Sequence, residues 1–360
     1  MSNTNRAVIF GGPSDEHDIS ILTGLQVARA LVGIQAVYWS KSGDWFQVDP
    51  ALEASDFRQG VPRKARPLVF VAAPGQGLVH KRKPLEIDVV LIACHGGPGE
   101  DGTLQGLLDL AGIRYTGPGQ AVSALGMDKL AFGAAMSAAG LPTLPRSLVS
   151  TGEEARPGFD GPYIVKPRFG GSSIGIEVAE DWPTVLGLKT VSRFLDQGAV
   201  VEPFLGGSRD LQVAVRTYPE WQLSAVEAPS RSAEGIYSYD QKYLAWGGEV
   251  SPGRELPAEL EEALASEVNR LSRRVTDVAG LRGIARIDYL EKDGEIFVNE
   301  VNTIPGSMAT YLWVDPPLER AVLFEDMLTE AEATATRVFS TAGSDGTALA
   351  NAGTIASKLG

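Results

Sequence analysis

The stretch 284-IARIDYLEKDGEIFVNEVN-302 constrains the fold more than any other part of the chain, because its pattern is typical of two strands joined by a tight turn. If Lys292-Asp293-Gly294 form a three-residue turn, residue 291 pairs with residue 295. Side chains alternate between the two faces of a strand, so one face of this hairpin collects polar groups. The predicted members of that face are Arg286, Asp288, Glu300 and Asn302.

The predicted register places Arg286 across from Glu300 and Asp288 across from Val298. Carboxylate and amide oxygens are the ligands that Mg²⁺ prefers, and Mg²⁺ commonly bridges substrate phosphates. Asp288, Glu300 and Asn302 are therefore candidate metal ligands. Arg286 beside them is placed to stabilise a developing oxyanion or phosphoryl charge. The alternative is a salt-bridged hairpin with one solvated face.

A phosphate-binding signal lies upstream and favours the metal site over that alternative. Lys166 stands near the end of the apolar strand 163-YIVKP-167, directly before the loop 168-RFGGSSIG-175 with its three glycines and two serines. Backbone N–H groups and an ammonium group in such a loop can hold nucleotide phosphates without a Walker motif. The alternative for this segment is a surface loop with a solvated lysine.

A second glycine-rich stretch, 97-GPGEDG-102, matches the dinucleotide-binding pattern G-x-G-x-x-G between a predicted strand and a predicted helix. However, Glu100 and Asp101 would place negative charge where a pyrophosphate must approach. No suitable acid follows about 20 residues later to hold a ribose. We therefore reject nicotinamide or flavin binding, and the chain has no P-loop motif either.

Composition excludes several other classes of function. The formal net charge is −13 and no basic block occurs, which argues against nucleic acid or an anionic membrane as a partner. The single cysteine, Cys94, rules out a disulfide framework and reads as a small buried side chain. Neither a signal segment nor a run of roughly 20 apolar residues is visible. We expect a soluble cytoplasmic protein.

The chain opens with the strand 6-RAVIF-10, a Gly-Gly turn and a helix for which Ser14 is a candidate N-cap. Further strands are predicted at 34–39 and 88–94, followed by a helix over 101–112, with polar and Pro-bearing sequence between the two strands. This alternation predicts an α/β first domain.

The organisation predicted for the whole chain has three units and a tail. The units are an N-terminal α/β domain (1–120), a central unit (121–200) and a C-terminal unit (201–335), the last beginning with the strand at 199–205. The polar, glycine-rich loop 229–257 is expected to act as a lid within the C-terminal unit. Residues 336–360 are rich in Ala, Gly, Ser and Thr and read as a flexible tail.

Together these residues resemble a known family, the D-alanine–D-alanine ligases of the ATP-grasp superfamily. Eight matching segments occur in family order across roughly residues 6–330. They are 11-GGPSDEHDIS-20, 95-HGGPGEDGTLQG-106, 115-YTG-117, 127-MDK-129, 165-VKPRFGGSSIG-175, 237-YSYDQKY-243, 285-ARIDY-289 and 299-NEVNTIPG-306.

The resemblance implies a three-domain ATP-grasp fold, with a Rossmann-like α/β domain followed by two α+β domains that clasp ATP. It also implies a reaction in two steps. The carboxylate of a first D-alanine attacks the γ-phosphate of ATP and forms an acyl phosphate. The amine of a second amino acid then attacks the acyl carbon, and phosphate leaves. Two Mg²⁺ ions, or Mn²⁺ in their place, are implied as cofactors.

Residue by residue, the resemblance assigns the phosphates of ATP to Lys129, Lys166 and the loop 170–175. Glu202 and the following Phe204-Leu205 would hold adenine, and Asp210 would contact the ribose. Asp210 stands where the family usually has Glu, so this contact is one methylene shorter. The full set implied for ATP is Lys129, Lys166, Gly171, Ser172, Ser173, Glu202, Phe204, Leu205, Asp210 and Lys242.

For the chemical step, the resemblance implies that Asp288, Glu300 and Asn302 bind the metal ions. Arg286 and the Gly306 backbone N–H would form the oxyanion hole. Glu16 would anchor the ammonium group of the first substrate, hydrogen-bonded to Ser172 and Tyr243. His95 is either a neighbour of the first substrate's carboxylate or a packing residue.

The acceptor is the open question. Relatives that make D-alanyl-D-lactate replace the lid tyrosine, so keeping Tyr243 indicates an amine acceptor. D-alanine ligases usually place Ser-Leu after the Gly306 turn to hold the second substrate's carboxylate, whereas this chain has Tyr311-Leu312. A shift by one residue would bring Thr310 into that role instead.

The sequence therefore predicts an ATP-dependent ligase that joins two D-alanine molecules for peptidoglycan. One alternative is a related dipeptide ligase with a different acceptor in a specialised peptide or resistance pathway. Another is a nucleotide-binding protein that has lost catalysis. Small amino acids are the expected partners, and a homodimer is expected from the resemblance.

Overall fold

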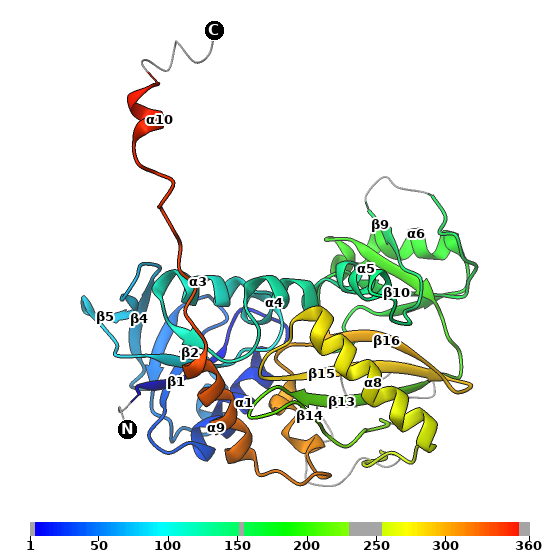
Figure 1. Ribbon diagram of the computed structural model, residues 1–360, viewed down its shortest axis with the longest axis horizontal. Coiled ribbons are helices and arrows are strands. Elements are labelled where there is room, and N and C mark those ends of the chain that lie inside the picture. Colours follow the sequence, from blue (N-terminus) through cyan, green and yellow to red (C-terminus); the bar gives the residue numbers. More distant parts are fainter. Residues whose placement is uncertain (1–3, 151–154, 230–253, 353–360) are drawn as a thin grey trace.

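The computed structural model describes residues 4–150, 155–229 and 254–352. Three sheets organise these residues, one of eight strands and two of four strands. Figure 1 shows the eight-stranded sheet at the N-terminal end of the molecule, with the two smaller sheets beside it. Among the described residues, no helix is long and apolar enough to cross a bilayer.

The N-terminal sheet has the strand order β6-β5-β4-β3-β2-β1-β7-β8. Neighbours from β2 through β1 and β7 to β8 are parallel, and those from β2 to β6 are antiparallel. Its strands are β1 (Arg6–Gly11), β2 (Gln35–Trp39), β3 (Trp45–Val48), β4 (Arg66–Val71), β5 (Gly77–His80), β6 (Lys83–Pro84), β7 (Val89–Ala93) and β8 (Arg114–Tyr115).

The central strands β1 and β7 are almost fully buried, as their continuous apolar runs lead one to expect for parallel strands covered on both faces. The antiparallel strands β3 to β6 are not predicted, because the sequence between residues 40 and 85 shows no clear period. The helical segments of this part are α1 (His17–Ala30), η1 (Ala54–Phe57), α2 (Gly97–Glu100) and α3 (Thr103–Ala111).

Helix α1 corrects one sequence prediction. Its N-cap residue is Glu16, and not Ser14 as expected. The Ser14 hydroxyl instead donates to the His95 carbonyl at 2.8 Å, so it ties the Gly-Gly turn to the segment after β7.

The second sheet has the order β11-β10-β12-β9, with every pair antiparallel. Strand β12 belongs here, so the prediction that the strand at 199–205 begins the third unit is wrong. The elements of this part are β9 (Ser147–Val149), β10 (Tyr163–Pro167), β11 (Glu177–Ala179), β12 (Ala199–Pro203), α6 (Trp182–Val191) and η2 (Arg193–Leu195).

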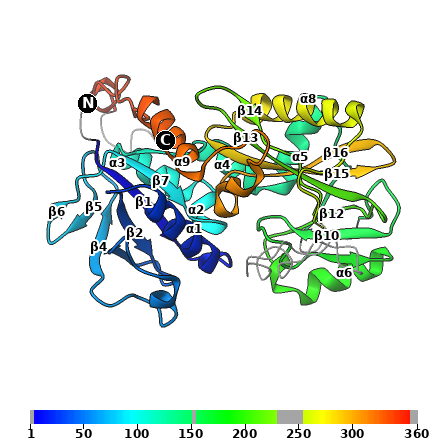
Figure 2. The ribbon, with the colours of Figure 1, turned by 90° about the horizontal axis from the view of Figure 1, so that it is seen from below.

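The third sheet has the order β14-β13-β15-β16. Its elements are β13 (Arg209–Arg216), β14 (Gln222–Leu223), β15 (Ile284–Lys292), β16 (Glu295–Asn302) and α8 (Glu262–Ala279). Two helices from the predicted central unit, α4 (Gln120–Met127) and α5 (Lys129–Ala138), also pack against β16. Figure 2 shows α6, the β10–β12 sheet, the β13–β16 sheet and α8 following one another in that order.

Alternation along β15 separates a packing face from a polar face. Ile287 and Tyr289 join a buried cluster with apolar side chains of helix α8, whereas Arg286 and Asp288 lie on the opposite face. The Tyr289 hydroxyl is hydrogen-bonded to Ser272 of α8 at 2.7 Å. One face of the sheet is thus committed to packing and the other is left for polar groups.

The hairpin itself departs from the predicted register in two ways. Lys292 pairs with Glu295, so the turn contains only two residues, Asp293 and Gly294, both with positive φ. This is the Asp-Gly turn whose twist suits a hairpin. A β-bulge at Asn299 then shifts the pairing, so that Asp288 lies opposite Glu300.

The bulge decides which side chains reach the polar face. Val298 lies opposite Tyr289 and is buried, so the prediction that Val298 faces Asp288 is wrong. Beyond the extra residue Asn299, Glu300 takes the opposite face. Arg286, Asp288, Glu300 and Asn302 share one face as predicted, although Arg286 lies opposite Asn302 and not Glu300.

Two C-terminal segments return to the N-terminal sheet. The 3-10 segment η3 (Gly306–Leu312) packs on α1, and α9 (Arg320–Ala333) packs on α1, β7 and β8. Met308, Leu312 and Phe324 are buried in the same cluster as β1 and β7. Arg337 still contacts Asp109 and Gln120, and the chain beyond it, which includes α10 (Thr347–Ala350), extends away from the body (Figure 1).

Candidate active site

Lys166 of β10 lies between the two four-stranded sheets. Its Nζ donates to Glu202 Oε2 on β12 at 2.7 Å and to Asn299 Oδ1 on β16 at 3.0 Å. Arg146 Nε lies 2.8 Å from the other oxygen of Glu202. Burial alone would raise the pKa of Glu202, but Lys166 and Arg146 outweigh it and hold the pKa below its usual value. The Lys166 ammonium is therefore fixed by an ionised, buried partner.

Lys129, the first residue of α5, contacts both the candidate phosphate loop between β10 and β11 and the candidate metal ligand Glu300 on β16. Its Nζ donates to the Gly170 carbonyl at 2.5 Å and lies 3.3 Å from Glu300 Oε2. The preceding Asp128 caps α5 through the N–H groups of residues 130 and 131. Asp128 also pairs with Arg168 at 2.6 Å, so one acid fixes both the helix start and the loop start.

The glycine-rich loop between β10 and β11 has positive φ angles at several positions. Ser172 and Ser173 have φ of 54° and 58°, in the left-handed region. The Ser172 hydroxyl donates a short hydrogen bond to Glu16 Oε1, which is the contact expected from the family resemblance. A Cβ on Gly171 would lie 2.9 Å from Glu16 Oε2, so this position suits glycine.

The residues implied for adenine and ribose stand on β12, directly after it, and on β13. Phe204 and Leu205 follow β12, and the Phe204 N–H donates to the Pro162 carbonyl. Asp210 lies on β13 opposite Leu290. The Glu202 side chain is engaged by Lys166 and Arg146, so adenine contact would fall to the backbone of this segment.

The candidate metal strand holds two carboxylates opposite each other. Asp288 is paired with Arg286, whose Nε and Nη2 donate to its two oxygens at 2.7 and 2.8 Å. Asn302 Nδ2 donates to Asp288 Oδ2 at 3.2 Å, and Glu300 faces Lys129. This donor set, two carboxylates and an amide on one face, fits Mg²⁺. Arginine and lysine supply the positive charge that the carboxylates need.

Glu16, the residue expected to bind a substrate ammonium group, is buried at the start of α1. It is only 8% exposed, and the Ser172 hydroxyl donates to its Oε1. Gly96 covers it, since a Cβ there would lie 2.6 Å from Glu16 Oε2, and Gly96 has φ of 65°. The glycine loop after β7 and the phosphate loop thus enclose Glu16 from two sides.

The turn before η3 is fixed by buried hydrogen bonds. His95 Nδ1 lies 2.7 Å from the Ile304 carbonyl and Nε2 lies 2.8 Å from Thr23 Oγ1. A carbonyl only accepts, so Nδ1 carries the proton and Nε2 accepts from Thr23. Thr23 Oγ1 accepts the Ser307 N–H at 3.1 Å. Burial lowers the pKa of His95, which agrees with a neutral ring. Both ring nitrogens of His95 are therefore used within the protein.

Gly306 begins η3 directly beyond this network. Ser307, Met308 and Ala309 all have left-handed φ, between 47° and 52°, which costs on the order of 1 kcal/mol for each residue. Such a turn persists only where its surroundings hold it. Here burial of Met308 and Ala309 against α1, together with the hydrogen bonds made by Thr23 and His95, supplies that support.

The residues expected to bind the acceptor substrate, Thr310 and Tyr311, lie in η3. Tyr311 lies under the guanidinium of Arg254, 4.8 Å from the ring centroid, and Arg254 Nε is 2.5 Å from Glu227 Oε1. Burial raises the pKa of Tyr311 to about 12, so the phenol stays neutral. The Thr310 hydroxyl is buried and, among the described residues, has no hydrogen-bond partner. Tyr243, Lys242 and most of the expected lid 229–257 lie outside the described residues.

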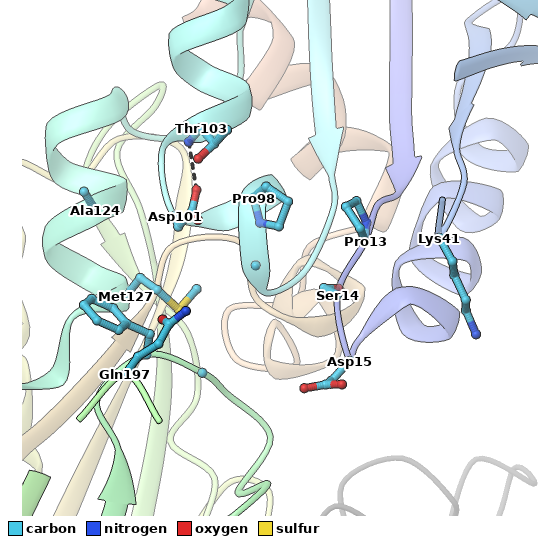
Figure 3. A pocket seen from close by; sticks show the side chains of 13 residues that line it. Pro13, Ser14, Asp15, Lys41, Pro98, Asp101, Thr103, Ala124, Met127 and Gln197 are labelled. Carbon is cyan, nitrogen blue, oxygen red and sulfur yellow. Dashed lines mark hydrogen bonds between the residues drawn. The ribbon is translucent and has the colours of Figure 1, made fainter. Parts of the chain in front are cut away.

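A cavity of about 810 Å³ lies next to the Glu16 turn. Figure 3 shows Pro13 to Asp15 on one side of it and Met127 and Gln197 on the other. Gly170 contributes to its wall, so the cavity borders the phosphate loop as well as the start of α1.

Sequence reasoning does not assign a role to four residues that organise the site: Arg146, Glu100, Thr23 and Asn299. Arg146 donates to the carbonyls of Lys129 and Asn299 in addition to its ion pair. No local pattern marks such residues, because each acts on segments far away in the sequence. The sequence singles out Glu100 only as an argument against dinucleotide binding.

Comparison with known proteins identifies the family of the chain. Residues 5–118 match the family model for the D-ala D-ala ligase N-terminus, and residues 140–330 match the model for its C-terminus. A D-alanine–D-alanine ligase from Mycobacterium sp. (strain KMS) is 33% identical over 368 residues. The match covers 92% of this chain and 97% of that protein.

Solved structures show the same fold at lower identity. The D-alanine-D-alanine ligase from Coxiella burnetii has a TM-score of 0.77 at 22% identity, covering 92% of this chain and 95% of that one. The VanG D-Ala:D-Ser ligase from Enterococcus faecalis has a TM-score of 0.78 at 23% identity, covering 92% and 100%. By its sequence and its fold, the chain belongs to the D-alanine–D-alanine ligase family of ATP-dependent ligases.

Proposed function

We propose that this protein joins two D-alanine molecules into D-alanyl-D-alanine, with ATP converted to ADP and phosphate, and that the product serves peptidoglycan synthesis in the cytoplasm. The observation that carries the proposal is the position of Lys129, which reaches both the phosphate loop at Gly170 and the metal strand at Glu300. Phosphate-binding groups and candidate metal ligands thus meet at one point.

In the first step, the carboxylate of D-alanine attacks the γ-phosphorus of ATP, and ADP leaves with the electrons of the broken bond. A carboxylate is a poor electrophile, so this activation is what makes amide formation possible. Lys166 and Lys129 offset the negative charge of the phosphates. Glu16 binds the ammonium group and so aligns the carboxylate with the phosphate loop.

The same site fits Mg²⁺, which when bound would neutralise phosphate charge. Asp288, Glu300 and Asn302 are the residues that would hold it. Arg286 pairs with Asp288, and the pair keeps a guanidinium at the reacting centre.

In the second step, the amine of the acceptor attacks the acyl carbon, loses a proton, and phosphate leaves. Negative charge develops on the carbonyl oxygen in this step. Arg286 and the Gly306 N–H are the donors proposed for it, and preorganised donors act strongly where water is excluded.

The residues expected at the acceptor site support a small amino acid as the second substrate. The Arg254 guanidinium lies over the ring of Tyr311, one of the residues expected to line the acceptor site, 4.8 Å from the ring centroid. Thr310 offers a buried hydroxyl for the acceptor carboxylate. We propose a small D-amino acid as acceptor, with D-alanine first and D-serine as the second candidate.

Phosphate release from ATP and Mg²⁺ across a panel of D- and L-amino acids and D-lactate tests the proposal. The expected result is release with D-alanine alone at a rate well above ATP hydrolysis without amino acid. Background release with D-alanine, together with turnover of a mixed pair, would instead establish a different acceptor.

A further inference from the structure

Glu100, at the end of α2, is a buried acid to which the proposed reaction steps assign no role. Its carboxylate is 7% exposed and makes hydrogen bonds in two directions. Oε2 accepts the Gly96 N–H at 2.9 Å, and Oε1 accepts the Ile304 N–H at 2.9 Å. The Thr303 hydroxyl lies 3.4 Å from Oε1. One side chain therefore joins two backbone segments that are about 200 residues apart in sequence.

Each of these segments carries part of the site. Gly96 covers the carboxylate of Glu16, the proposed ammonium anchor, and leaves no room for a side chain. Ile304 lies two residues before Gly306, the proposed oxyanion donor, and only Pro305 separates them. Because proline restricts φ, a shift of Ile304 is passed on to Gly306.

Both backbone polar groups of Ile304 make hydrogen bonds to side chains. Its N–H donates to Glu100 and its carbonyl accepts from His95. The next hydrogen bond, from Ser307 N–H to Thr23, fixes the far side of Gly306. Glu100 is the member of this set that also holds the Gly96 loop, so it sets the separation of the two walls of the first-substrate site.

We propose that Glu100 is a positioning residue for ligation, whose two carboxylate oxygens fix the Gly306 N–H relative to the substrate held by Glu16. This inference rests on the proposed function and adds a residue to it. Glu100 touches neither substrate nor metal ligand in this assignment and acts only through the backbone at Gly96 and Ile304.

Glu100→Gln tests the assignment with little change in volume. The amide keeps one acceptor oxygen, but its NH₂ group faces a backbone N–H and cannot accept from it. Either the Gly96 N–H or the Ile304 N–H therefore loses its hydrogen bond to residue 100. The expected result is a fall in kcat for D-alanine-dependent phosphate release of about 100-fold, as for a small misplacement of reacting groups. The KM for ATP should stay within about two-fold, since neither Lys129 nor Lys166 contacts Glu100.

The matched control is Glu86→Gln, the same chemical change at an exposed position of the N-terminal part. This variant should keep wild-type kinetics. Glu100→Asp gives a second variant that keeps both oxygens but shortens the span, and its kcat should lie between those of the wild type and Glu100→Gln. Amide hydrogen exchange of the full-length protein should quicken at Gly96 or Ile304 in Glu100→Gln and stay unchanged in Glu86→Gln.

Two results would overturn the positioning role. Glu100→Gln could match Glu86→Gln in kcat while the wild type is active. Alternatively, kcat, ATP affinity and thermal stability could all fall together in Glu100→Gln, which would make Glu100 a purely structural residue. A wild-type protein without D-alanine-dependent phosphate release would contradict the proposed function itself, and the positioning role with it.

Discussion

The hydroxyl of Ser172 donates a hydrogen bond to the carboxylate of Glu16, although 156 residues separate them in the sequence. This contact connects the phosphate loop to the start of α1. The proposed anchor of the first substrate and the proposed cover of the ATP phosphates are therefore joined directly, and a change at one side alters the other.

Ser172→Ala removes the donor and leaves a buried carboxylate with one partner fewer. A hydrogen bond to a charged group contributes about 1.5–3 kcal/mol, so the KM for the first D-alanine should rise roughly ten-fold or more. Ser173→Ala, its neighbour in the same loop, should raise the KM for ATP instead. Initial rates over a D-alanine and an ATP series separate the two, and equal effects of both variants on both substrates would refute the separate roles.

Glu300→Gln should reduce phosphate release by about 100-fold or more, because it removes one of the two carboxylates proposed to hold Mg²⁺. The fold should persist, since Glu300 is not part of a buried hydrophobic cluster. Glu295→Gln, on the same strand but exposed near the hairpin turn, is the control. Near wild-type turnover of Glu300→Gln at saturating Mg²⁺ would show that the metal assignment is wrong.

Thr310→Ala should weaken binding of the second D-alanine and leave binding of the first D-alanine unchanged. The loss of one hydrogen bond to the acceptor carboxylate, about 1.5–3 kcal/mol, corresponds to a rise in the acceptor KM of roughly ten- to a hundred-fold. Measuring peptide formation with D-alanine in the first position and varied D-serine or D-alanine in the second resolves the acceptor KM. An unchanged acceptor KM would leave Tyr311 and Arg254 as the residues that define this end of the site.

Glu100 should also leave a signature in the pH dependence of stability. Burial raises its pKa to about 7, with Glu16 adding to the rise and the hydrogen bonds from Gly96 and Ile304 opposing it. Because the folded protein binds this proton more tightly than the unfolded chain does, the stability contributed by the protonated form is present below the unfolded pKa of 4.5. It is lost as pH rises toward about 7.

The size of that loss is about 3 kcal/mol. Urea unfolding between pH 5 and pH 8 should therefore show a decline in the free energy of unfolding that is smaller in Glu100→Gln, which does not titrate. Identical pH dependence in both proteins would mean that Glu100 stays ionised throughout.

Much of the candidate metal site could be predicted, because alternation along β15 depends only on strand geometry. Arg286 and Asp288 reach the polar face for this reason. The bulge at Asn299 could not be predicted, since a single extra residue leaves no periodic signal, yet it turns Glu300 toward Asp288 and Val298 into the core. The dipeptide Asp293-Gly294 is itself typical of a two-residue hairpin turn, so this turn could have been predicted. The prediction of a three-residue turn is wrong.

The roles of residues that join segments from different sheets could not be predicted from the sequence. Arg146 and Glu100 bind backbone groups whose positions follow only from the packing of three sheets. The same holds for α4 and α5, which sequence order assigns to the central unit although they pack against β16. The packing of α9 and η3 on α1 likewise has no local signal, because it depends on the chain returning to its first sheet.

The central claim is that a D-alanine carboxylate attacks ATP and forms an acyl phosphate. D-alanine labelled with ¹⁸O in its carboxylate, incubated with ATP, Mg²⁺ and the wild-type protein, tests it directly by mass analysis of the released phosphate. The account predicts one ¹⁸O atom in the phosphate for each D-alanyl-D-alanine formed. Phosphate that carries only solvent or ATP oxygen, released without dipeptide, would contradict it.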